Sequence, residues 1–137
     1  MRGTSPLLAG LLVLAGTPAF AELQPGSVAP LFATKASLGG KNFDFDLRRA
    51  LAKGPVVLYF YPAAFTTGCT LEAHDFASHI DDYRRLGAVV IGVSGDDIAT
   101  LTRFSVSECR STFAVASDAS HAISKSYDAT LGFGPVQ

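Results

Sequence analysis

The chain has 137 residues, of which 48% are hydrophobic and 17% charged, and its 11 lysines and arginines nearly balance its 12 aspartates and glutamates. This composition excludes a disordered chain and a basic nucleic-acid-binding surface, and two cysteines are too few for a disulfide scaffold or a four-cysteine zinc site. We therefore expect one globular domain in which each cysteine needs its own explanation.

The first 21 residues have the features of a secretory signal peptide. Met1-Arg2 gives a positive start, residues 7–15 are apolar or small, and Ala19-Phe20-Ala21 has the small-x-small pattern of a cleavage site. The apolar stretch is about half as long as the roughly 20 residues of a membrane-spanning helix. We expect residues 1–21 to be removed and residues 22–137 to form a domain outside the membrane, exported to the periplasm or secreted.

Five segments of the mature chain have the composition of strands. The strongest is residues 56–61 (VVLYFY), whose continuous apolar run after Gly54-Pro55 is typical of a strand buried on both faces, so we expect it to be the central strand. Gly39-Gly40 predicts a hairpin turn within residues 38–41. In chain order the predicted strands are residues 31–37, 42–47, 56–61, 88–94 and 112–116.

Helical spacing and capping residues predict three helices between and after these strands. They are residues 67–86, ended by Gly87; a helix from Asp96 or Asp97 to about Cys109; and a helix from Asp118 to about Tyr127. This alternation of strands and helices predicts an α/β domain, built on a sheet with a parallel core and helices on both faces.

Cys69 falls in the first turn of the first predicted helix. Its neighbours on the apolar face of that helix are Ala73, Phe76, Ile80 and Tyr83. Free N–H groups and the positive end of the helix dipole would stabilise a thiolate there, whereas simple burial would leave an inert thiol. Pro62 fixes the preceding loop, and Thr66 and Thr67 place hydroxyls at the helix start, which together favour a reactive cysteine.

Residues 62–69 (PAAFTTGC) match the P-x-x-x-T-x-x-C signature, and the chain thereby resembles the peroxiredoxins. The resemblance is to the peroxiredoxin Q or bacterioferritin comigratory protein branch, and it covers roughly residues 26–130. It implies a thioredoxin-like fold and a thiol peroxidase that reduces hydrogen peroxide and organic hydroperoxides without metal, flavin or another cofactor. It also implies a thiol reductant such as a thioredoxin-like protein.

The resemblance assigns roles to three residues of this motif. Cys69 would be the peroxidatic cysteine, which attacks the peroxide O–O bond and becomes a sulfenic acid. Thr66 would hydrogen-bond the reacting oxygens, and Pro62 would shield the thiolate from water.

The chain departs from the family pattern at the resolving cysteine. Many members carry that cysteine five residues after the peroxidatic one, where this chain has His74, which helical geometry predicts to be a surface residue. Cys109 is then the candidate resolving cysteine, and an intramolecular disulfide with Cys69 would suit an exported protein. The alternative is that Cys109 is a packed core thiol.

A second departure concerns the arginine with which peroxiredoxins hold the thiolate. It comes from a strand later than any predicted here, and Arg110 is a weak substitute because its place before Asp118 suits an earlier element. We expect the chain to be truncated, without the closing hairpin and final helix of the fold. The sequence does not fix an oligomeric state, and we favour a monomer.

Three other readings compete with a peroxidase. A thioredoxin-like thiol oxidoreductase needs C-x-x-C, which the sequence after Cys69 does not offer. A truncated and inactive paralogue would fold without catalysis. A metal site would draw on Cys69, His74, Asp75, His79 and Asp81, but histidines five residues apart lie about 140° apart on a helix, so one ion cannot easily bind both.

Overall fold

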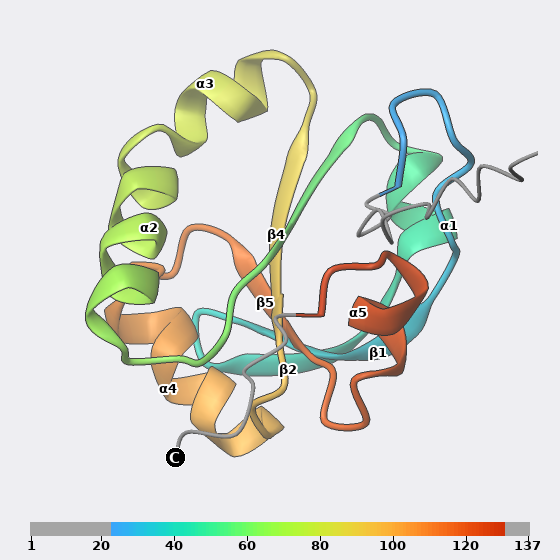
Figure 1. Ribbon diagram of the computed structural model, residues 1–137. Helices are drawn as coiled ribbons and strands as arrows, with labels where there is room; N and C mark the ends of the chain where they lie inside the picture. Colours follow the sequence, from blue (N-terminus) through green and yellow to red (C-terminus); the bar gives the residue numbers. More distant parts are fainter. Residues whose placement is uncertain (1–22, 131–137) are drawn as a thin grey trace, which may run out of the picture.

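Five strands form one mixed sheet in the computed structural model, which describes residues 23–130 (Figure 1). The predicted signal peptide, residues 1–21, lies outside the described residues. The strands are β1 (Ala33–Leu38), β2 (Lys41–Asp46), β3 (Val56–Phe60), β4 (Val89–Ser94) and β5 (Ala114–Ser117). They lie in the order β2-β1-β5-β4-β3, in which β3, β4 and β5 are parallel and β1 is antiparallel to both β2 and β5.

Helices cover both faces of this sheet, as predicted. They are α1 (Leu47–Leu51), α2 (Thr67–Ser78), α3 (Ile80–Arg85), α4 (Ile98–Ser107) and α5 (Ala122–Ser126). Figure 1 shows α2, α3 and α4 on one side of the sheet and α1 and α5 on the other. The core is divided accordingly: one apolar cluster includes both cysteines, and a second is built around Ile91 and Val93. Within residues 23–130, no helix is long and apolar enough to span a membrane.

The predicted hairpin is confirmed and is formed by β1 and β2. Leu38 pairs with Lys41 across a two-residue turn of Gly39 and Gly40. Both glycines have positive φ angles, +55° and +79°, which a two-residue turn of this hand requires.

The prediction that residues 56–61 form the central strand is wrong for the sheet formed by residues 23–130. β3 pairs only with β4 there and lies at the sheet edge, while β1, β5 and β4 occupy the interior. All five residues of β3 are only partly buried. A continuous apolar run indicates that both faces of a strand are covered, but hydrogen-bonded neighbours lie in the plane of the sheet, where side chains carry no information about them.

The single helix predicted over residues 67–86 is two helices that meet at His79, whose φ of −106° and ψ of 9° are not helical. The Ser78 hydroxyl donates to the His74 carbonyl at 2.7 Å, and the His79 ring lies 2.9 Å from the Asp75 carbonyl oxygen. Side chains that bond to helix carbonyls in this way compete with the backbone ladder and bend helices.

Two aspartates cap helices that differ from the predicted ones: one helix was not predicted, and the other begins later in the chain than expected. Asp46 ends β2 and accepts from Arg49 N–H at 3.2 Å, which begins the unpredicted helix α1. Asp118 lies four residues before α5, yet its carboxylate accepts from the N–H groups of Ile123 and Ser124 at 3.0 and 2.8 Å. Asp118 therefore caps the last helix as predicted, from further upstream.

Candidate active site

The candidate site lies where the parallel strands end. Because β3, β4 and β5 run in the same direction, the loops that follow them meet at one edge of the sheet, the usual place for sites in parallel sheets. Two hydrogen bonds join these loops: Asp118 N–H donates to the Ser94 carbonyl at 2.7 Å, and the Ser117 side-chain hydroxyl donates to the Asp96 carbonyl at 2.7 Å.

Cys69 is the third residue of α2 and faces the core, as predicted. Its side chain is 6% exposed and belongs to the apolar cluster that contains Tyr61 and Phe104. Thr66 is the N-cap residue, but its hydroxyl donates to the Ala63 carbonyl at 3.0 Å and makes no capping bond. The N–H groups of the first helical turn beside Cys69 are therefore not used by the N-cap side chain.

The loop before Cys69 is held by Asp96. The Ala64 N–H and the Ser94 hydroxyl both donate to one Asp96 carboxylate oxygen, each at 2.7 Å. Phe65 has a left-handed φ of +65°, and its ring packs edge-on against Phe104 with centroids 5.2 Å apart. The sequence suggested Asp96 only as a possible helix cap, and its contact with a loop 32 residues away was missed.

Pro62 and Thr66 flank this loop on the protein surface. Both are exposed, and Pro62 borders a cavity of about 490 Å³ near the carboxyl ends of the parallel strands. Ser94, His121 and Lys125 contribute to the cavity wall, whereas Cys69 does not. Pro62 is thus the point where the loop meets the cavity, whereas Cys69 lies in the apolar core.

Cys109 is completely buried just after the end of α4. Its thiol belongs to the same apolar cluster as Cys69, and both cysteines are free. Burial, and secondarily the negative charge of Glu108, raises the pKa of Cys109 to about 12. The packed thiol is therefore protonated at neutral pH and is a poor nucleophile while it stays in the core.

Tyr59 in β3 and Tyr61, which directly follows that strand, line the same core. Tyr61 stacks on Phe104 at 5.6 Å and on Tyr59 at 5.5 Å, and Tyr59 stacks on Phe76 at 4.4 Å. Burial raises the pKa of both phenols. The thiols are thus surrounded by aromatic rings that exclude water.

His74 lies at the surface, as helical geometry predicted, but it is paired and partly shielded. Its Nε2 atom lies 2.7 Å from a carboxylate oxygen of Glu108, and the two side chains are only 36% and 19% exposed. The helical angle correctly turns His74 away from Cys69, and Glu108, the C-cap residue of α4, lies against that face of α2.

Arg110 does not reach the thiol. Its guanidinium donates to the Ser78 hydroxyl at 3.3 Å, at the opposite end of α2. Ser78 follows Cys69 by nine residues, which is about 13 Å along a helix axis. Arg110 is therefore not the substitute for the family arginine.

The metal-site reading finds no support in the part of the chain that the structure describes. There, no three histidine, cysteine or acidic side chains gather closely enough to hold an ion. His74 pairs with Glu108, whereas His79 pairs with Asp75 at 3.5 Å.

The AhpC/TSA family model matches residues 25–132, which is most of the chain and includes every element described above. The chain belongs to the AhpC/TSA family. Two curated members are similar to it. The putative peroxiredoxin bcp of Helicobacter pylori is 41% identical over 88 residues, 64% of this chain and 55% of that protein. The chloroplastic peroxiredoxin Q of Triticum aestivum is 40% identical over 106 residues, 77% of this chain and 46% of that protein. The chain spans about half the length of these relatives.

Solved structures of a BcpB protein and of a peroxiredoxin Q share the fold of this chain. Peroxidoxin BcpB from Mycobacterium tuberculosis superposes with a TM-score of 0.67 and 29% identity, over 74% of this chain and 64% of that chain. Peroxiredoxin Q from Xanthomonas campestris gives a TM-score of 0.60 and 32% identity, over 69% of this chain and 58% of that chain. These matches confirm the predicted thioredoxin-like fold and the predicted resemblance to the peroxiredoxin Q and bcp branch.

Proposed function

We propose that the protein is a thiol peroxidase that reduces hydrogen peroxide and organic hydroperoxides at Cys69. The observation that carries the proposal is the position of Cys69, buried in the first turn of α2 after a loop held by Asp96, in a chain of the AhpC/TSA family. The Cys69 thiolate attacks the peroxide, so an S–O bond forms and the O–O bond breaks. The leaving oxygen takes a proton and departs as water or an alcohol, and Cys69 becomes a sulfenic acid.

Thr66 and Pro62 act on the substrate side of this step. Thr66 lies at the exposed N-cap of α2, where its hydroxyl exchanges the Ala63 carbonyl for the peroxide oxygens when substrate binds, as the family resemblance implies. Pro62 covers the loop before the helix and limits access of water to the thiolate.

Cys109 resolves the sulfenic acid. Its thiolate attacks the Cys69 sulfur, the S–S bond forms, the S–O bond breaks, and hydroxide leaves and takes up a proton to become water. A dithiol reductant such as a thioredoxin-like protein then reduces the disulfide and is itself oxidised. Because Cys109 is fully buried and protonated in the folded state, this step requires the segment after α4 to open.

Peroxide consumption tests the proposal. The wild-type chain, supplied with a thioredoxin system, consumes hydrogen peroxide, whereas Cys69→Ser does not. Equal rates in the two proteins would establish the inactive paralogue instead. Reduction of a protein disulfide by the chain without peroxide would favour the thioredoxin-like oxidoreductase. Peptide mapping under non-reducing conditions after one equivalent of peroxide identifies a disulfide between Cys69 and Cys109.

Export completes the proposed function and is supported by the sequence of residues 1–21. The peroxidase acts in the periplasm or outside the cell as a monomer. Amino-terminal sequencing of the protein recovered from those fractions would begin at Glu22, and a mature chain that begins at Met1 would contradict export.

A further inference from the structure

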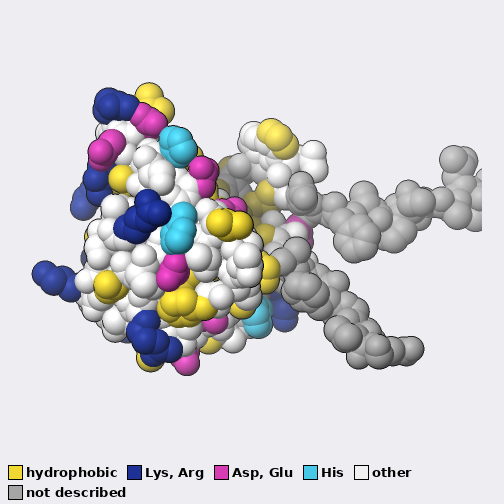
Figure 2. Space-filling view, turned by 90° about the vertical axis from the view of Figure 1, so that its left-hand side faces the viewer, with side chains coloured by type: hydrophobic (Ala, Val, Ile, Leu, Met, Phe, Trp, Pro, Cys, Tyr) yellow, Lys and Arg dark blue, Asp and Glu magenta, His cyan; other side chains and the backbone are white. Residues whose placement is uncertain are grey.

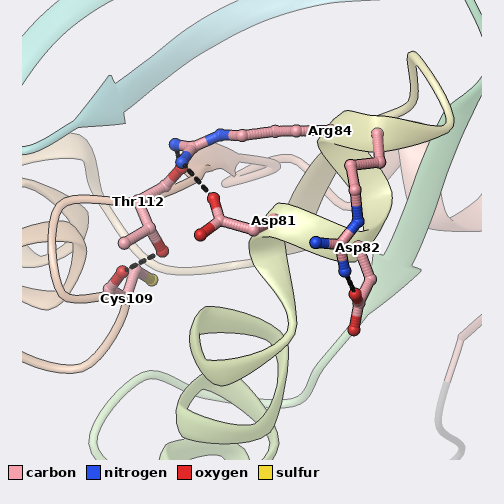
Figure 3. A network of polar contacts seen from close by, with 6 residues as sticks. Asp81, Asp82, Arg84, Cys109 and Thr112 are labelled. Carbon is pink, nitrogen blue, oxygen red and sulfur yellow. Dashed lines mark hydrogen bonds and ion pairs between the residues drawn. The ribbon is translucent and has the colours of Figure 1, made fainter.

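The segment that carries Cys109 is bound along one side by α2 and α3. We call residues 108–112 the Cys109 loop. Three of its residues contact the helices: Glu108 pairs with His74 at 2.7 Å, Arg110 donates to Ser78 at 3.3 Å, and the Thr112 carbonyl accepts from Arg84 at 3.0 Å. Figure 3 shows the third of these contacts, in which the Arg84 guanidinium meets both Asp81 and Thr112, with Cys109 alongside.

These contacts involve alternate residues of the loop, and the thiol points to the other side. Cys109 is completely buried, whereas Arg110 and Ser111 are exposed. Arg110 and Ser111 both have left-handed φ angles, +49° and +56°, an arrangement that costs roughly 1 kcal/mol or more for each such residue. The backbone therefore stores strain in Arg110, which one of these contacts holds, and in Ser111, whose N–H donates to the Ser105 carbonyl at 2.9 Å.

His74 and Glu108 form the strongest of the three contacts. Theirs is the shortest, it joins two side chains that can be oppositely charged, and both are partly shielded from water, whereas the other two contacts are exposed. It also joins the helix that carries Cys69 to the residue immediately before Cys109. Figure 2 shows this face of the molecule, where histidine side chains lie among acidic and basic ones.

We propose that the His74–Glu108 pair is a clasp that sets how readily Cys109 leaves the core. His74 is thereby a positioning residue for the resolving step: it acts through Glu108 and touches no reacting atom. Loss of the clasp releases the start of the strained Cys109 loop, and the thiol is exposed more often. The part of this inference that concerns disulfide formation rests on the proposed function, and the part that concerns exposure of Cys109 does not.

Thiol labelling measures exposure directly. In a Cys69→Ser background Cys109 is the only thiol, and its reaction rate with an aryl disulfide reagent reports the fraction of time that the loop is open. We expect His74→Ala and Glu108→Ala each to raise the rate about fivefold, as for the loss of one partly shielded hydrogen bond. The double variant should be no faster than the faster single variant, because both substitutions remove the same contact.

His79→Ala is the matched control, since His79 is also a histidine beside α2, and among residues 23–130 its ring pairs with Asp75 and not with the Cys109 loop. It should label at the rate of the parent protein. Labelling is repeated in low urea, because opening of a single loop exposes little surface and depends weakly on urea, unlike global unfolding. Rates equal to the parent in both single variants, multiplicative effects in the double variant, or a steep urea dependence would overturn the clasp.

The chain with both cysteines tests the consequence for resolution. Under excess peroxide, His74→Ala should form the Cys69–Cys109 disulfide faster and accumulate less sulfinic acid, with an unchanged rate of sulfenic acid formation. An unchanged disulfide rate despite faster labelling would overturn the positioning role. If Cys69 of the wild type forms no sulfenic acid, the proposed peroxidase function fails, and the labelling experiment still decides whether the clasp exists.

Discussion

The Asp96 carboxylate makes two hydrogen bonds with one oxygen, and the position of the loop before Cys69 depends on them. Asp96→Ala leaves the Ala64 N–H without this acceptor, so the loop is less well ordered over the thiol. We expect the rate of sulfenic acid formation to fall about tenfold, because small displacements of reacting groups are costly. Asp96→Asn keeps an oxygen acceptor and should recover most of the rate. Single-turnover kinetics with one equivalent of peroxide measures both.

The neighbouring aspartate provides the control. Asp97 accepts from the Thr100 N–H at 2.7 Å and caps α4, and this bond lowers the pKa of its carboxyl. Asp97→Ala should lower the urea midpoint slightly and leave the rate of the folded protein unchanged. If Asp97→Ala slows sulfenic acid formation as much as Asp96→Ala does, the positioning role of Asp96 is wrong.

Asp96 and Asp97 also show which contacts of a single residue can be predicted from the sequence and which cannot. Local spacing indicated a helix cap at Asp96 or Asp97, because a cap contacts residues two or three positions away. It could not indicate that Asp96 bonds to Ala64, since that contact depends on how two loops meet in space. The reactive cysteine was predictable because its helix, its loop and its motif are contiguous in sequence.

At the level of elements, β3 and β4 fit together because Gly92 has no side chain. Gly92 pairs with Tyr59 across the two strands, and a Cβ atom on Gly92 would lie 2.6 Å from Cζ of the Tyr59 ring. That ring cannot retreat, because Phe76 and Phe113 pack against it. We expect Gly92→Ala to reduce the free energy of unfolding by about 2–3 kcal/mol, as overpacking of a core does. Urea unfolding measures this loss.

Gly68→Ala is the matched substitution for this test. Apart from the adjoining residues and the backbone of its own helix, nothing lies within 4 Å of a Cβ placed on Gly68, which is in the first turn of α2. Alanine should therefore raise the free energy of unfolding by up to about 1 kcal/mol, because it favours the helix. A loss at Gly68 equal to that at Gly92 would mean that the strand contact is not the cause.

The elements themselves were largely predictable, and the errors have physical causes. The hairpin followed from Gly39-Gly40, and the alternation of strands and helices fixed the class of fold. The break at His79 was not visible, because the apolar stripe continues from α2 into α3 and helical periodicity depends on that stripe alone. The edge position of β3 among the described strands was hidden for a similar reason, since the composition of a strand reports its faces and not its in-plane neighbours.

At the scale of the whole molecule, the buried Cys109 thiol makes the free energy of unfolding depend on pH in the alkaline range. The folded state raises the pKa of Cys109 from 9.0 to about 12, so between these values the unfolded chain loses a proton that the folded chain retains. Stability is therefore complete below about pH 9 and falls as pH rises, by at most about 1.4 kcal/mol per pH unit from this one group. Urea unfolding at a series of pH values measures the slope.

Cys109→Ala separates this contribution from others. The variant loses a constant amount of stability through its smaller side chain, but its free energy of unfolding should change less than that of the wild type between about pH 8 and about pH 10. The buried phenols of Tyr59 and Tyr61 have the same sign and act at higher pH, because their ordinary pKa is 10.0. Identical pH profiles for the two proteins would show that Cys109 ionises as readily folded as unfolded.

The two-layered core also determines how the protein can be observed. The chain has no tryptophan and four tyrosines, so its near-ultraviolet emission comes from tyrosine alone. Tyr59, Tyr61 and Tyr83 pack in the layer that holds the cysteines, whereas Tyr127 lies on the opposite side of the sheet against Phe32 and Phe60. Three of the four tyrosines thus share a core layer with the thiols. We expect oxidation of the cysteines to change the tyrosine emission, which would report the reaction without a dye or an engineered fluorophore.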